Sequence, residues 1–176
     1  MPLTAFQSET LRLLAAHRSP ESFLAGGTVL NAGVDSPRYS KDLDIFHDVE
    51  ASVVTSAETD AATLRQAGYG VEWLLRQPLF QRAEVVRNGR RLLVEWLFDS
   101  AFRFFPVEPD DLAGWRLNLH DAATNKLLAL MGRGDAKGVI HTSPGQRPGF
   151  ISPKTPLALK ARFILRYETG RWPATE

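Results

Sequence analysis

The sequence contains no cysteine, few histidines and no long apolar run, and each absence excludes a class of protein. Without cysteine among its 176 residues, the chain has no disulfide, no thiol nucleophile and no zinc–thiolate site. Its four histidines show no metal-ligand spacing, so we expect them to be surface or structural residues. The N-terminal region carries Glu9 and Arg12 without a sustained hydrophobic stretch. We therefore expect neither a signal peptide nor a membrane span, and a cytoplasmic location.

The composition and charge of the chain are typical of a globular protein. The chain is 44% hydrophobic and 23% charged, which is enough for one core and a small helical appendage. We expect a core at residues 1–118 and a helical C-terminal portion at 119–176, which together form one compact unit. The net charge is only +1, but eight basic and three acidic residues lie from residue 133 onward, a local surplus of +5. This basic end is a candidate surface for an acceptor or a partner.

Hydrophobic periodicity predicts strands alternating with helices. The dipeptide Asn88–Gly89 between two strands is a strong signal for a β-hairpin. A loop containing Pro106 and Pro109 follows, and Asp121 is a plausible N-cap for the helix after it. The fold class is therefore α/β, a small mixed sheet flanked by helices. The predicted helices are Leu3–His17, 28–34, Ala51–Gln66, Ala122–Met131 and Leu157–Tyr167, and the predicted strands are Phe23–Ala25, Asp42–Phe46, Tyr69–Arg76, Phe80–Arg87 and Arg91–Phe98.

Two carboxylates in the strand Asp42–Phe46 predict a cation site. Alternate side chains of a strand share one face, so Asp42 and Asp44 project together while Leu43 and Ile45 point into the core. Held about 7 Å apart along the backbone, the two carboxylates repel each other. A hard divalent ion such as Mg²⁺ offsets this repulsion and retains coordination positions for water and phosphate.

A glycine pair upstream of the two aspartates predicts a phosphate site. Gly26 and Gly27 allow the backbone to approach an anion closely, and Thr28 is a candidate cap for the following helix, whose N-terminal amides attract phosphate. Ser40, directly before the carboxylates, is a further candidate phosphate contact.

Together, Gly26-Gly27-Thr28 and Ser40-x-Asp42-x-Asp44 resemble the nucleotidyltransferase superfamily of DNA polymerase β-like enzymes. The later run from Asp121 through Lys126 to Arg133 is similar to the lysine-bearing helix of the AbiEii-type nucleotidyltransferase toxins. The resemblance covers roughly residues 20–135.

The resemblance implies the transfer of a nucleoside monophosphate from an NTP to an acceptor hydroxyl, with Mg²⁺ or Mn²⁺ as cofactor. It implies that Gly26, Gly27, Thr28 and Ser40 contact the phosphates and that Lys126 neutralises triphosphate charge. By the same resemblance, a toxin of this type acts on tRNA or another cellular target and is countered by an antitoxin protein. Small-molecule acceptors are equally compatible with the site.

A third carboxylate is needed to hold the ion that activates the acceptor hydroxyl. Glu95 is the first candidate, because a charge inside the apolar strand Arg91–Phe98 is costly unless it is paired or bound to metal. Asp99, four residues on, is the alternative. The third acid of the superfamily sits within the strand, which favours Glu95.

One stretch departs from the family pattern. Where AbiEii-type sequences carry two acidic residues after the arginine, this chain has Gly138 and His141, although a basic residue is kept at Lys137. The alternative hypothesis is therefore a non-catalytic nucleotide-binding or protein-interaction member with a degenerate acceptor site. The retained pair Asp42 and Asp44 favours the enzyme, since without catalysis nothing requires two repelling carboxylates there.

Overall fold

A computed structural model of the chain describes residues 3–31 and 40–133. The predicted helix Leu157–Tyr167 and the altered stretch 137–141 lie outside these residues. The chain divides into two units, Met1–Ala122 and Ala123–Glu176. The division predicted after residue 118 stays a prediction. In the described part of the chain, no helix has the length and apolar character needed to cross a membrane.

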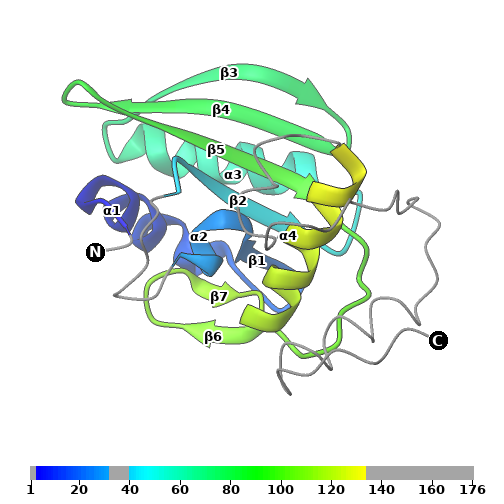
Figure 1. The fold of residues 1–176 in the computed structure, drawn as a ribbon. Coiled ribbons are helices and arrows are strands. Elements are labelled where there is room, and N and C mark those ends of the chain that lie inside the picture. The colour runs from blue at the N-terminus through cyan, green and yellow to red at the C-terminus, as the bar shows by residue number, and fades with distance from the viewer. Residues whose placement is uncertain (1–2, 32–39, 134–176) are drawn as a thin grey trace, which may run out of the picture. The chain divides into compact units, whose positions relative to one another are not determined.

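The helices and strands follow the predicted order closely (Figure 1). The helical elements are α1 (Ala5–Leu14), η1 (Ala15–His17), α2 (Gly26–Leu30), α3 (Ser52–Gln66) and α4 (Leu119–Arg133). The strands are β1 (Ser22–Ala25), β2 (Asp42–His47), β3 (Gly70–Gln77), β4 (Phe80–Arg87), β5 (Arg90–Phe98), β6 (Glu108–Asp110) and β7 (Gly114–Arg116).

Within the described residues, the strands form one mixed sheet in the order β3-β4-β5-β2-β1-β7-β6 (Figure 1). β2 lies at the centre, antiparallel to β1 and parallel to β5. The hairpins β3-β4, β4-β5 and β6-β7 are antiparallel, and β1 and β7 are parallel. This mixed sheet with flanking helices confirms the predicted α/β class.

The hairpin β4-β5 sets the register beside the central strand. Both turn residues have positive φ, 52° at Asn88 and 74° at Gly89, as a tight two-residue hairpin turn requires. The turn places Arg82 directly opposite Glu95. The predicted Asn-Gly turn therefore fixes which side chain of β4 is the neighbour of Glu95.

The segment predicted as a proline-containing loop forms a small hairpin instead. β6 and β7 pair with each other, and β7 adds to the free edge of β1. The sequence signal was weak because each strand has only three residues and β6 contains Pro109, a residue confined to edge strands. β6 occupies the edge of the sheet, which is where a proline is tolerated.

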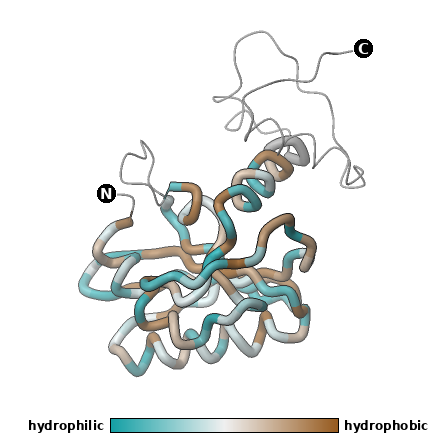
Figure 2. The backbone as a smooth tube through the Cα atoms, turned by 90° about the horizontal axis from the view of Figure 1, so that it is seen from below, coloured by the Kyte–Doolittle hydropathy of each residue, from teal (hydrophilic) through white to brown (hydrophobic). Residues whose placement is uncertain are grey.

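The central strands bury one face and leave the other half-buried. Along β2, Leu43, Ile45 and His47 are buried, whereas Asp42 and Asp44 are half-buried. The backbone of the sheet carries both hydrophobic and hydrophilic residues (Figure 2). The buried face packs against α3, so the carboxylates lie on the opposite face.

A buried carboxylate attaches α3 to the back of the sheet. Asp60, fully buried on α3, accepts hydrogen bonds from Arg18 (2.8 and 2.7 Å), from His17 Nδ1 (2.7 Å) and from Trp96 Nε1 (2.7 Å). Trp96 is the residue after Glu95 on β5 and points to the other face. This network therefore fixes β5 directly behind the candidate site.

Replacing Asp60 with Asn leaves the buried Arg18 guanidinium without its countercharge. We expect Asp60→Asn to lower the free energy of unfolding by about 3 to 5 kcal/mol, as for a broken buried ion pair. The matched control is Glu58→Gln on the same helix, which removes an exposed pair with Arg76 and costs about 1 kcal/mol or less. Urea denaturation measures both. Equal losses in the two variants would contradict a stabilising role for the buried network.

Candidate active site

Three carboxylates lie on one face of two neighbouring strands. In the parallel pair β2-β5, Asp44 is in register with Glu95, and Asp42 is two residues earlier on β2. Paired residues of adjacent strands lie about 4.8 Å apart, and alternate residues of one strand about 7 Å apart, and both sets share a face. The structure thus brings together the three acids singled out from the sequence.

The alternative third acid lies elsewhere. Asp99 follows the last residue of β5, and its backbone N–H donates to the carbonyl oxygen of His47, at the end of β2. Four residues of strand, about 13 Å, separate its Cα from that of Glu95. The geometry therefore favours Glu95 over Asp99, although the role of either acid stays a prediction.

The Gly26–Gly27 turn makes room for the side chains beside it. Gly26 has φ +63°, and a Cβ atom placed there would lie 1.8 Å from Asp44 Oδ2. A Cβ atom at Gly27 would lie 2.9 Å from Ser40 Oγ. Close approach and a positive φ therefore require glycine at Gly26, close approach favours it at Gly27, and the Asp44 carboxylate lies against the backbone of the turn.

The hydroxyls of Thr28 and Ser40 hold the start of β2. Thr28 was expected to cap α2, but that helix begins at Gly26, and the Thr28 hydroxyl donates to the carbonyl oxygen of Asp42 (2.8 Å). Ser40 Oγ donates to Asp42 Oδ1 (2.7 Å). The Ser40 carbonyl accepts from Gln7 Nε2 (2.9 Å), so α1 also fixes this segment. Phosphate contacts by Thr28 and Ser40 stay predictions.

Sequence reasoning missed the partner of Glu95. Arg82 on β4 contacts Glu95 Oε1 through Nε (2.7 Å) and through a terminal nitrogen (2.6 Å). The strand face and the hairpin register were both readable from the sequence, and together they place Arg82 beside Glu95.

Two of the three acidic residues can serve as ligands for a divalent cation, and the third contacts Arg82. Asp42 and Asp44 supply the oxygen ligands that Mg²⁺ and Mn²⁺ prefer. Gly26 leaves space for the Asp44 carboxylate that any side chain would fill. Arg82 holds Glu95 Oε1, so Glu95 would join such a site either by exchanging this contact or through its second oxygen. Accordingly, among residues 3–31 and 40–133, no group of three or more acidic or histidine side chains is already arranged as a metal centre.

Two residues of α4 were singled out from the sequence, Asp121 as a helix cap and Lys126 as a triphosphate contact. Asp121 does not cap the helix: Asn118 does, its side-chain oxygen accepting from the His120 N–H (2.9 Å). The Asp121 carboxylate instead accepts from the backbone N–H groups of Phe104 and Phe105 (both 2.9 Å). Lys126 is exposed on α4 in the second unit, and its contact with a triphosphate stays a prediction.

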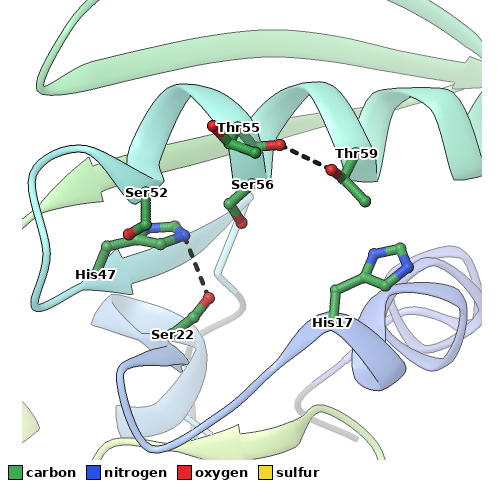
Figure 3. A pocket seen from close by; sticks show the side chains of 7 residues that line it. All are labelled: His17, Ser22, His47, Ser52, Thr55, Ser56 and Thr59. Carbon is green, nitrogen blue, oxygen red and sulfur yellow. Dashed lines mark hydrogen bonds between the residues drawn. The ribbon is translucent and has the colours of Figure 1, made fainter.

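A pocket of about 280 Å³ lies on the α3 side of the sheet (Figure 3). Hydroxyl side chains of α3 line it together with His17, Ser22 and His47, and Ser22 Oγ hydrogen-bonds His47 Nε2 (3.2 Å). Burial, reinforced by the charge of Arg18, lowers the pKa of His47 to about 4, so this imidazole is neutral at neutral pH. None of its lining residues is a lysine or arginine, and the pocket is therefore a poor triphosphate site.

A mixed sheet that carries carboxylates on adjacent strands beside a Gly-Gly turn is the arrangement expected of the nucleotidyltransferase class. Residues 12–107 match the family described as nucleotidyl transferase AbiEii toxin of a type IV toxin–antitoxin system. Because the match spans more than half of the chain, the protein belongs to this family. The matched segment includes every predicted site residue except Lys126.

Several solved structures are similar to the chain. A proposed nucleotidyltransferase from Helicobacter pylori is 17% identical, covers 80% of this chain and 64% of its own, and has a TM-score of 0.48. JHP933 from Helicobacter pylori is 16% identical, with coverages of 69% and 53% and a TM-score of 0.46. MenT4, a nucleotidyltransferase toxin from Mycobacterium tuberculosis H37Rv, is 21% identical, with coverages of 72% and 51% and a TM-score of 0.47.

The chain spans less than two thirds of the length of each of these three structures. Membership of the family rests on the sequence match. A comparison with curated proteins finds no match.

Replacing Gly26 with Ala tests the close approach at the turn. A Cβ atom 1.8 Å from Asp44 Oδ2 forces that carboxylate to move, so we expect Gly26→Ala to weaken Mn²⁺ binding by about tenfold or more. The matched control is Gly68→Ala, where φ is +80° but nothing lies within 4 Å. Both variants lose about 1 kcal/mol to backbone strain, and only the first loses metal affinity. Calorimetric titration that finds equal Mn²⁺ affinities would contradict this role of Gly26.

Proposed function

We propose that the protein is a metal-dependent nucleotidyltransferase that moves a nucleoside monophosphate from an NTP to an acceptor hydroxyl. The register of Asp44 with Glu95, on the face that also carries Asp42, is the observation that supports this proposal most directly. Membership of the AbiEii family supports the same reaction class.

Asp42, Asp44 and Glu95 are the residues that would hold the metal. A bound Mg²⁺ or Mn²⁺ neutralises phosphate charge and lowers the pKa of the acceptor hydroxyl. Ser40 keeps Asp42 oriented through its hydroxyl, and Gly26 keeps Asp44 against the turn. The protein contributes mainly positioning and electrostatics, as is usual in phosphoryl transfer.

The triphosphate would lie at the end of β1, where the Gly26–Gly27 backbone is open to close approach. We assign its phosphate contacts to Gly26, Gly27, Thr28 and Ser40, with Lys126 as the neutralising cation. In the reaction, the acceptor oxygen forms a bond to the α-phosphorus and the bond to pyrophosphate breaks. The hydroxyl proton is released to solvent.

The family description supports a toxin role in a toxin–antitoxin pair. On that basis we propose a cognate antitoxin protein as partner, tRNA as the acceptor and the cytoplasm as the location. The basic surplus from residue 133 onward favours an acceptor that carries phosphate. Apart from Arg133, these residues lie outside the described part of the chain, so this support comes from the sequence alone.

A non-catalytic nucleotide-binding member is the second candidate. The ion pair between Arg82 and Glu95 favours it, because the third carboxylate is held by a guanidinium. The two candidates predict different behaviour toward NTP: a non-catalytic member binds NTP but transfers no nucleoside monophosphate to an acceptor.

Incubation with each α-labelled NTP, Mg²⁺ and a cell extract tests the proposed activity. We expect label to enter RNA in the wild type, and Glu95→Gln to retain NTP binding while transfer falls by about 100-fold or more. Asp99→Asn is the control and should transfer label normally. Full activity in Glu95→Gln with an inactive Asp99→Asn would show that Asp99 is the third acid.

Thermal melting separates binding from transfer. At about 100 times the Kd, NTP with Mg²⁺ stabilises by about 2.7 kcal/mol, which raises the Tm of a chain of this size by roughly 5 to 10 °C. The double variant Asp42→Asn with Asp44→Asn should lose this rise while its metal-free Tm is unchanged or slightly higher. An unchanged rise in the double variant would show that the metal binds elsewhere.

A further inference from the structure

Arg82 has a position that the proposed reaction does not explain. It lies in one row across the sheet with Glu95 and Asp44, since Arg82 pairs with Glu95 and Glu95 pairs with Asp44 in the strand registers. Ala25, which precedes the Gly26 turn, pairs with Asp44 on the far side of that row. The order across the four strands is therefore arginine, carboxylate, carboxylate, glycine turn.

This order gives Arg82 a defined side of the site. The triphosphate would bind at the glycine turn, beyond Asp44. Arg82 is at the opposite end of the row, beyond Glu95, which is the acid that faces the acceptor hydroxyl in the proposed reaction. A guanidinium at that end of the row is positioned to contact the acceptor, whereas the NTP would bind at the other end.

The contact between Arg82 and Glu95 is suited to exchange. The Arg82 side chain is 40% exposed and that of Glu95 is 14% exposed. An ion pair with one solvated partner shifts an equilibrium by only about fivefold or less. The guanidinium also packs over the Phe80 ring, 5.1 Å from its centroid, which supports the side chain without requiring the carboxylate.

We propose that Arg82 is an exchangeable counterion: it neutralises Glu95 in the metal-free protein and moves to an acceptor phosphate when Glu95 takes a divalent ion. The inference rests on the proposed function. It adds that Glu95 binds either Arg82 or metal, and that the acceptor is a nucleic acid whose backbone phosphate Arg82 recognises. An arginine fork matches phosphate oxygens in the same bidentate manner as carboxylate oxygens.

The first readout is Mn²⁺ affinity without nucleotide, measured from free Mn²⁺ by electron paramagnetic resonance. Removal of the competing guanidinium in Arg82→Gln should tighten Mn²⁺ binding about two- to fivefold. The matched control is Arg91→Gln, which removes the same charge from the same hairpin but breaks a pair with Glu84. Equal Mn²⁺ affinities in the two variants overturn the proposal.

The second readout is the affinity for total tRNA in the presence of Mn²⁺ and a non-hydrolysable NTP analogue. Arg82→Gln should bind tRNA about three- to tenfold more weakly than Arg91→Gln, with a salt slope shallower by about one. Arg82→Lys, which keeps the charge and loses the fork, should be intermediate. A tRNA affinity in Arg82→Gln equal to that of Arg91→Gln overturns the acceptor contact and with it the proposal.

The failure of this inference differs from the failure of the proposed function. If wild-type Mn²⁺ binding is lost in Asp42→Asn with Asp44→Asn but Arg82→Gln behaves like Arg91→Gln, the metal site stands and Arg82 has no part in it. If the wild type binds no Mn²⁺, or if binding survives in the double variant, the metal site and the Arg82 exchange both fail.

Discussion

The parallel pairing of β2 with β5 is the constraint on which the candidate site depends. It places Asp44 opposite Glu95, and a slip of one residue would turn one of these acids toward α3. Like charges on paired residues of neighbouring strands repel each other. The described residues offset this repulsion locally: Arg82 contacts Glu95, and Ser40 donates to Asp42. A divalent ion would replace part of that compensation.

The opposite face of the sheet explains how the register is held. The same alternation that exposes the carboxylates buries Leu43, Ile45 and Trp96 against α3. Trp96 donates to Asp60, so a hydrogen bond as well as packing fixes β5 directly behind Glu95. Positioning of the acids is therefore a property of the core, and a change on α3 acts on the site through β5.

Local sequence patterns predicted the acidic strand and the central hairpin. They did not predict strands that form only through pairing with distant segments. Alternation identified the acidic strand, and Asn88–Gly89 identified the hairpin, because period and turn chemistry are local signals. The segment 108–116 was expected to be a loop, since two three-residue strands form only by pairing with each other and with β1. The partner of Glu95 follows from the hairpin register and the strand face taken together, whereas the partners of Asp60 lie more than 30 residues away and leave no local signal.

The central claim, that acids on β2 and β5 share a divalent ion, is tested most directly by a crystal structure with Mn²⁺ and a non-hydrolysable NTP analogue. Anomalous scattering locates the metal independently of the protein model. We expect a peak about 2.0 to 2.3 Å from oxygens of Asp42 and Asp44, with Glu95 released from Arg82 and turned toward the metal. A nucleotide-bound peak that contacts neither aspartate would contradict the assignment of the site.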